Sequence, residues 1–138
     1  MASCFRIGPW DCVTVSEEGA KVRAAREVLS AEDLALSVQV LQEFYVQATR
    51  PSRTGRLTHG QAAALIQSFL RFPVQESTLT LMRASLESTH RFRISPWDAG
   101  IIEAARILGC RSVLSEDLAH GRDYDGIKVE NPFRPKRC

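Results

Sequence analysis

Three acidic residues occupy positions from which they could bind a divalent metal ion. Glu43 lies just under two turns into a predicted helix, Asp98 lies in the first turn of another, and Asp117 lies two residues past the end of the predicted strand SVLS (112–115). Hard cations such as Mg²⁺ prefer oxygen ligands and usually keep several waters, so two or three carboxylates suffice to hold one. A metal held in this way can activate water and neutralise charge on a phosphodiester. A metal site of this kind would therefore be suited to the hydrolysis of a phosphodiester.

Each of these acids also has an ordinary explanation. Glu43 lies at the boundary between apolar and polar helix positions, where solvation alone accounts for it. Asp98 can be the acidic residue of a capping box, and Asp117 can be a loop or cap residue with Glu116 as a competitor for its role. Because the chain contains 16 acidic residues, spacing alone does not separate a metal site from these alternatives.

The apolar spacing predicts the elements that would position the acids. A period of three to four residues predicts helices, and short apolar runs predict strands. The expected helices lie within 18–30, 37–47, 58–70, 78–92 and 95–109. The expected strands are 34–36, 112–115 and an edge strand at 127–130. Residues with good capping propensity support the helix starts at Ser37, Thr58 and Ser95.

The order of these elements predicts an α/β fold. Strands that alternate with helices favour a parallel sheet covered on both faces. In such folds ligands bind where the carboxyl ends of the strands meet. Residues that form a ligand site should therefore lie at that edge of the sheet. Glu43, Asp98 and Asp117 can all lie near it.

The composition fits one globular domain. The chain has 138 residues, of which 44% are hydrophobic and 25% are charged, and a chain of this length can bury its own core. The net charge of +2 indicates no particular class of partner. No run approaches the ~20 apolar residues of a membrane span, and no basic segment followed by an apolar run indicates a signal peptide. We therefore expect a cytoplasmic protein.

Other catalytic and metal-binding motifs are missing from the sequence. The four cysteines form no Cys-x-x-Cys pair and have no histidine at zinc-ligand spacing, so we expect free thiols in a reducing compartment. The sequence has no glycine-rich phosphate loop, no Gly-x-Ser-x-Gly elbow and no cysteine–histidine nucleophile pattern. The basic residues of 134–138 are expected to be a solvated end, with RNA backbone contact as the minority alternative.

Three segments of the chain carry distinctive motifs: SVQVLQEFY (37–45), SPWDAGIIEAARILGC (95–110) and VLSEDLAHGRDYDGIKVENPF (113–133). The second segment has an aromatic-Asp-Ala start and a Gly-Cys end, and the third has a Ser-Glu-Asp-Leu-x-His-Gly run followed by Asp-Gly and Asn-Pro-Phe. Together these segments resemble the PIN-domain family, most closely its VapC-like toxins from bacterial toxin–antitoxin pairs. The resemblance covers about residues 18–133.

This resemblance implies a PIN-like three-layer α/β sandwich with a central parallel sheet. It also implies a Mg²⁺- or Mn²⁺-dependent endoribonuclease that is usually a homodimer, acts on an RNA substrate and is held inactive by a cognate antitoxin protein. The metal-binding and catalytic acids of the family correspond to Glu43, Asp98 and Asp117. Ser115 corresponds to a small hydroxyl residue that supports the site.

The N-terminal segment departs from the family pattern. PIN domains open with a strand ending in Asp-Thr-Asn, whose Asp is a principal metal ligand, and no Asp-Thr-Asn occurs here. Asp11 is the only nearby acid and is therefore a further candidate metal ligand. We divide the chain into an atypical N-terminal segment (1–17), a PIN-like domain (18–133) and a basic tail (134–138). Two alternatives to an active nuclease stay open: a catalytically degenerate PIN domain that keeps only dimerisation or antitoxin binding, and a purely structural α/β domain.

Overall fold

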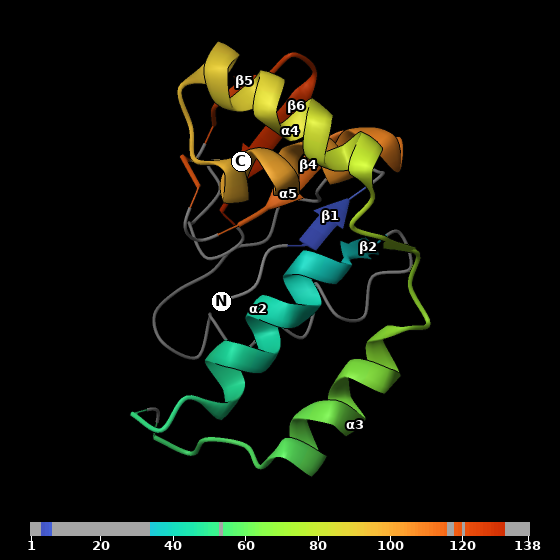
Figure 1. The fold of residues 1–138 in the computed structure, drawn as a ribbon. Helices are drawn as coiled ribbons and strands as arrows, with labels where there is room; N and C mark the ends of the chain where they lie inside the picture. Colours follow the sequence, from blue (N-terminus) through green and yellow to red (C-terminus); the bar gives the residue numbers. More distant parts are fainter. Residues whose placement is uncertain (1–3, 7–33, 53, 116–117, 120, 132–138) are drawn as a thin grey trace, which may run out of the picture.

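Six short strands form one sheet in a computed structural model of the protein (Figure 1). The structure describes residues 4–6, 34–52, 54–115, 118–119 and 121–131. Across the sheet the order is β3 (Val74–Gln75), β2 (Leu34–Ser37), β1 (Cys4–Arg6), β4 (Ser112–Leu114), β6 (Ile127–Glu130) and β5 (Asp123–Tyr124). The strands predicted at 34–36 and 112–115 are thereby confirmed as β2 and β4.

The sheet is mixed, because its central strand runs against its neighbours. β2 pairs in parallel with β3, and β4 pairs in parallel with β6. β1 is antiparallel to both β2 and β4, with Phe5 opposite Ala35 on one side and Val113 on the other. The predicted central parallel sheet is therefore found in part: the β2–β3 and β4–β6 pairs are parallel, whereas β1 and the β5–β6 pair are antiparallel. β2 and β4 nevertheless run in the same direction, so their carboxyl ends lie at the same edge.

Four helices are described, and each was predicted to within a few residues. They are α2 (Val38–Thr49), α3 (His59–Phe69), α4 (Leu79–Phe92) and α5 (Pro96–Ile107). The helix expected within 18–30 lies outside the described residues. In the described part of the chain, no helix has both the length and the apolar character that a bilayer crossing needs.

A hydroxyl side chain begins every described helix. Each cap oxygen accepts a hydrogen bond from the backbone N–H three residues later, which satisfies one of the free donors at the helix start. The pairs are Ser37 with Val40, Thr58 with Gln61, Thr78 with Leu81 and Ser95 with Asp98. These local signals explain why the sequence pattern predicted the helix starts so closely.

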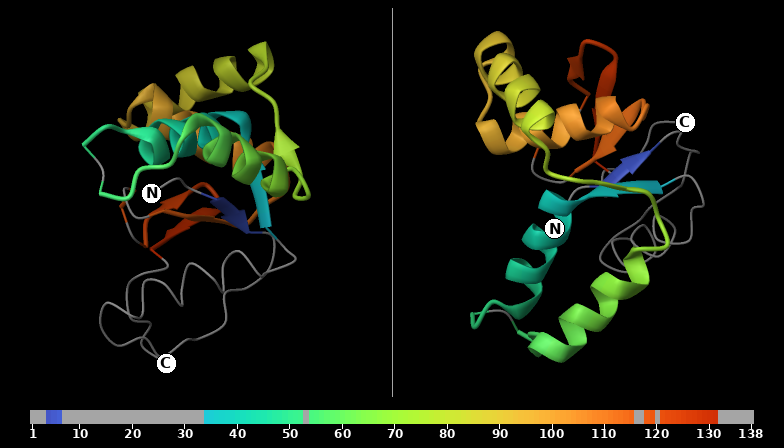
Figure 2. Two further views of the ribbon diagram at one scale, coloured as in Figure 1. Left: turned by 90° about the horizontal axis from the view of Figure 1, so that it is seen from below. Right: turned by 45° about the vertical axis from the view of Figure 1, so that its right-hand side comes forward.

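The described helices lie on one side of the strands (Figure 2, left). α5 packs against β2, β4 and β6, α4 packs on α5, and α2 contacts β2, α3 and α5. Because α5 lies between α4 and the sheet, it is buried without interruption from Ala99 to Ala105. The described part of the chain therefore shows a mixed α/β arrangement in which α5 is the central helix.

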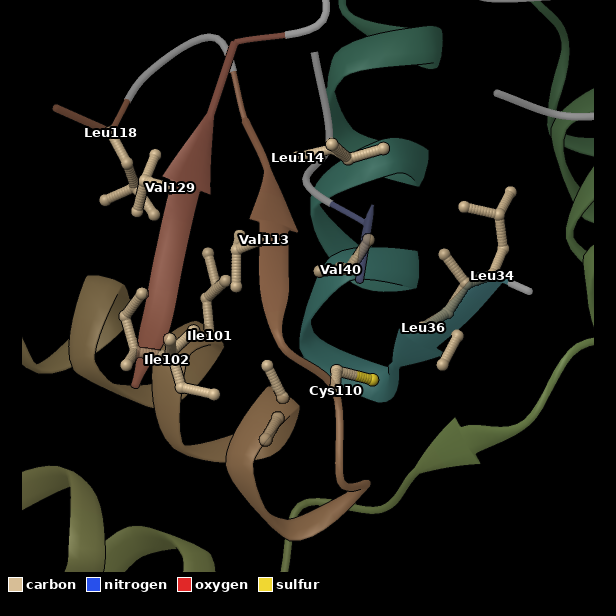
Figure 3. Packing of buried hydrophobic residues seen from close by; sticks show 14 of the residues in the cluster. Leu34, Leu36, Val40, Ile101, Ile102, Cys110, Val113, Leu114, Leu118 and Val129 are labelled. Atoms are coloured by element: carbon tan, nitrogen blue, oxygen red, sulfur yellow. The ribbon is translucent and has the colours of Figure 1, made fainter. Parts of the chain in front are cut away.

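The core lies between α5 and the strands (Figure 3). Every residue of β2 and β4 is buried, whereas β6 alternates between buried and exposed or half-buried positions. Ile102, Val113 and Val129 are each 0% exposed, so the helix and the strands exclude water from their contact. This packing holds the carboxyl ends of β2 and β4 and the start of α5 in a defined arrangement.

The C-terminal hairpin corrects one prediction. β6 was expected to be an edge strand, but it lies between β4 and β5. β5 was not predicted, and it joins β6 through the two-residue turn Asp125-Gly126, in which φ is 54° at Asp125 and 97° at Gly126. An Asp-Gly pair is a strong hairpin signal because both positions favour positive φ, so the sequence did contain the information.

Cys110 is the one cysteine whose side chain the structure describes, and it is a free, buried thiol. Burial raises the pKa of Cys110 from 9.0 to about 11 because the thiolate would lose its hydration. A thiol with so high a pKa is a poor nucleophile at neutral pH. The free thiol at this position agrees with the expectation from the sequence. Cys12 and Cys138 lie outside the described residues.

Candidate active site

A cleft of about 470 Å³ opens where the carboxyl ends of β2 and β4 meet the start of α5. Its walls come from α2, from the first turns of α5 and from the residues that follow β4. The lining residues are Gln39, Gln42, Glu43, Val46, Gln47, Trp97, Asp98, Ile101, Ser115 and Leu118. The cleft therefore lies at the edge of the sheet that the order of elements predicted for a ligand site.

The cleft brings together three of the predicted site residues. Glu43, Asp98 and Ser115 all line it, although they come from α2, α5 and the end of β4. Asp117 and Asp11 lie outside the described residues, so the structure gives no position for these two predicted ligands. The metal-binding and catalytic roles of all of these residues stay predictions.

Glu43 is positioned by the direct passage from β2 into α2. The Ser37 hydroxyl accepts a hydrogen bond from Val40 N at 3.2 Å, so the helix begins at the last residue of the strand. Glu43 then lies in the second turn, half-buried at the cleft wall. Its Oε1 accepts a hydrogen bond from Gln39 Nε2 at 3.2 Å, between side chains four residues apart on one helix face.

Asp98 is positioned by the start of α5. Ser95 caps the helix and accepts from Asp98 N at 3.1 Å, and Pro96 occupies the first turn. α3 has a complete capping box, in which Gln61 also bonds back to the Thr58 backbone. Within the described residues the Asp98 carboxylate makes no such return bond, so the capping explanation accounts for its backbone N–H only. The side chain is half-buried and lines the cleft.

Ser115 lies at the end of β4, where the strand leaves the sheet. It is 1% exposed, and its N–H donates to Glu130 O at 2.9 Å, which continues the pairing between β4 and β6. Its hydroxyl accepts a hydrogen bond from Leu118 N at 3.3 Å. Ser115 therefore links the end of β4 to Leu118, and its supporting role stays a prediction.

The charge of the cleft is negative. Among its described lining residues, Glu43 and Asp98 are ionisable acids and none is a lysine, arginine or histidine. The glutamines of the wall add neutral amide oxygens. Mg²⁺ and Mn²⁺ prefer oxygen ligands such as carboxylates and amide carbonyls. The acidic and glutamine side chains of the cleft therefore fit a hard divalent cation.

The described residues place two acidic side chains at the cleft. The described residues contain no group of three or more His, Cys, Asp or Glu side chains that could hold a metal ion. Glu43 and Asp98 thus contribute two carboxylates. Mg²⁺ is commonly bound through one or two carboxylates with waters completing its octahedron, so two are compatible with metal binding.

Three residues of this region were not predicted. Gln39 bonds to Glu43 and to the backbone of Trp97, Trp97 exposes 71% of its surface beside the cleft, and Gly100 lies directly against Gln39. The sequence contained two signals for these residues. One is a glutamine four residues before Glu43, and the other is a glycine inside the predicted helix 95–109.

Comparison with known proteins gave no matching family model and no significant similarity to a curated protein. The link to PIN domains therefore depends on the motifs in segments 37–45, 95–110 and 113–133, and membership of that family is a proposal.

Proposed function

We propose that this protein is a Mg²⁺- or Mn²⁺-dependent endoribonuclease of the VapC-like PIN class. The observation that carries the proposal is the meeting of Glu43 and Asp98 in one cleft whose described lining bears no positive charge. These two acids were selected from the sequence by their position near strand ends and by the family motifs. Unrelated surface acids that are far apart in sequence would not be expected to share a cleft.

Glu43 and Asp98 would hold the metal ion, with Asp117 and Asp11 as the additional ligands proposed from the sequence. When bound, such an ion activates a water molecule and stabilises negative charge on the phosphodiester. The chain itself supplies the arrangement that this chemistry needs. Two half-buried carboxylates line a cleft without a competing cation from the described residues, and the burial of α5 restricts the movement of the helix that carries Asp98.

The side chains in the cleft wall favour single-stranded RNA as the proposed substrate. Trp97 is a large apolar side chain that is 71% exposed next to Asp98, and an exposed indole face can stack on an unpaired base. Gln42 and Gln47 present amides that can donate to and accept from base edges. Stacking requires an accessible base, so we expect unpaired RNA to be preferred over a duplex.

We include the three-layer PIN sandwich in this proposal. The described helices cover one side of the sheet, and the second layer of helices is expected from the family resemblance. A homodimer and a cognate antitoxin are the proposed protein partners, and both come from the family resemblance.

Calorimetric titration with Mn²⁺ tests the proposed site. Wild-type protein is expected to bind the metal, and Asp98→Asn and Glu43→Ala are each expected to weaken binding at least tenfold. Glu87→Gln is the matched control, because Glu87 is an exposed acid on α4 outside the cleft lining. Cleavage of single-stranded RNA should require the metal and be lost in both cleft variants. Metal-dependent cleavage that survives Glu43→Ala would contradict the role of Glu43.

A catalytically degenerate PIN domain is the second candidate function. Two observations favour it: the described residues supply two carboxylates to the cleft, and the sequence has no Asp-Thr-Asn near its beginning. This candidate predicts dimerisation or antitoxin binding without metal-dependent cleavage. Absence of Mn²⁺ binding at millimolar concentration, together with a dimer in sedimentation equilibrium, would favour it over the nuclease.

A further inference from the structure

One side-chain amide connects the two helices that carry the cleft acids. Gln39 Nε2 donates to the backbone oxygen of Trp97 at 2.8 Å and to Glu43 Oε1 at 3.2 Å. The first bond reaches the opening turn of α5, one residue before Asp98, and the second reaches the carboxylate on α2. Gln39 is thus the described residue that couples the position of Glu43 to the segment bearing Asp98.

Gly100 provides the space that this arrangement needs. A Cβ atom at position 100 would lie 2.6 Å from Gln39 Oε1 and 3.6 Å from its Cδ. Real Cβ atoms essentially never show contacts under 3.0 Å, so the flexible end of the Gln39 side chain, which carries its amide, would have to shift to admit a larger residue. Position 100 is buried in the interior of α5, where glycine is otherwise unfavourable for a helix. The close approach of Gln39 is a physical reason for glycine here.

The chemistry of an amide suits this position better than a charged donor would. A lysine or arginine next to Glu43 would offset the negative charge that attracts a cation. The amide N–H fixes the direction of the carboxylate but leaves its charge unchanged. The hydrogen bond engages Oε1, one of two carboxylate oxygens that together can accept about four hydrogen bonds or ligands, so the group keeps capacity for a metal.

We propose that Gln39 is a positioning residue for the metal site, and that Gly100 is the residue that allows it to act. Gln39 holds the Glu43 carboxylate in the cleft and ties it to the start of α5. The inference rests on the proposed metal-dependent function and deepens it. Hydrogen-bond partners of metal ligands typically change metal affinity by about 10–100-fold when they are removed, and a change within this range is expected.

The test is Mn²⁺ titration of the full chain by calorimetry, with two ways of removing the contact. Gln39→Met keeps the side-chain length but has no N–H group, and Gly100→Ala displaces an unchanged glutamine. Each is expected to weaken Mn²⁺ binding about tenfold or more. Gln67→Met, an exposed glutamine on α3, and Gly60→Ala, whose Cβ would meet nothing within 4 Å, are the matched controls and should bind as wild type does.

A double variant separates this role from damage to the fold. Once Gln39 is shortened to alanine, a Cβ at position 100 no longer meets the amide. Gly100→Ala should therefore weaken Mn²⁺ binding in the wild-type background and have no further effect in the Gln39→Ala background. A general loss of folding would instead reduce binding additively, and circular dichroism at the titration temperature shows whether each variant is folded.

The outcomes distinguish this inference from the proposed function. If wild type binds Mn²⁺, Glu43→Ala does not, and Gln39→Met binds as wild type does, the positioning role is overturned and the metal site stands. If wild type itself fails to bind Mn²⁺, the proposed function is overturned and this inference with it. Weakening by Gln39→Met and Gly100→Ala, without additivity in the double variant, supports the proposal.

Discussion

Glu103 and Arg106, one turn apart on α5, form an ion pair with 3.0 Å between Oε2 and Nε. The other oxygen of Glu103 accepts a 2.6 Å hydrogen bond from the Ser88 hydroxyl on α4. The Arg106 guanidinium also donates to the backbone oxygens of Asp125 and Tyr124 at 2.7 and 2.6 Å. One buried carboxylate and one arginine thus join α4, α5 and the β5–β6 hairpin.

Removal of Arg106 is expected to destabilise the protein markedly. Arg106→Ala would leave Glu103, which is 6% exposed, without its cation, and would leave two hairpin carbonyls without their donor. Because the arginine itself is one-third exposed, we expect a loss of about 2 kcal/mol in the free energy of unfolding rather than the larger value for a fully buried pair. Urea denaturation measures it. Arg83→Ala, at an exposed position on α4, should change stability by less than about 0.5 kcal/mol.

Replacement of Trp97 is expected to weaken RNA binding. Stacking of a base on an aromatic side chain contributes about 1–3 kcal/mol, so Trp97→Ala should raise the Kd for a labelled single-stranded oligonucleotide roughly tenfold, and Trp97→Phe should raise it less. Fluorescence anisotropy without added metal isolates binding from cleavage. Leu79→Ala removes a side chain of similar exposure, 58%, from α4 and serves as control. An unchanged Kd in Trp97→Ala would exclude stacking at this wall.

Replacement of the helix-capping residues Ser37 and Thr58 separates an effect on stability from an effect on the metal site. Each hydroxyl accepts one backbone hydrogen bond, so Ser37→Ala and Thr58→Ala should each lower the free energy of unfolding by about 1 kcal/mol. Only Ser37 caps the helix that carries Glu43. Mn²⁺ titration should therefore show weaker binding in Ser37→Ala and unchanged binding in Thr58→Ala. Equal effects of both variants on metal affinity would mean that global stability, not the start of α2, governs the site.

Cys110 gives the protein a stability that depends on pH. Its pKa is raised from 9.0 to about 11 by burial, so the folded state keeps the thiol proton at pH values where the unfolded state has lost it. The contribution is complete below pH 9 and is lost as the pH rises through 11. Cys110→Ala removes this dependence, so its stability deficit at pH 8 should shrink at pH 10.5. A constant difference between the two urea midpoints would contradict the assignment.

Local signals explain which parts of the fold could be predicted. Ser37, Thr58 and Ser95 were expected to start helices, and their hydroxyls do cap them, because capping depends on residues only three positions apart. The short apolar run 34–36 indicated a buried strand, and 112–115 was predicted as a strand, because both patterns lie within a few consecutive residues. The direction of β1 could not be predicted in this way, because it depends on pairing with segments far along the chain.

The candidate site also has a part that could be predicted from the sequence and a part that could not. The motifs selected Glu43, Asp98 and Ser115, and all three line one cleft. The contact between Gln39 and Gly100 was not predicted, because it joins side chain and backbone of two different helices and appears only when α2 meets α5. The Asp125-Gly126 turn is a different case, since its signal was present in the sequence and was overlooked.

The position of β1 has a consequence for how the protein folds. Within the described sheet, β1 is the strand that joins β2 and β3 to β4, β6 and β5. Its two partners are far apart in the sequence, Leu34 and Ala35 on one side and Ser112 to Leu114 on the other. Such pairings between distant segments close large loops and form slowly. Glu43 follows β2 of the first group and Ser115 follows β4 of the second, so the cleft should be assembled late in folding, after its separate halves have formed.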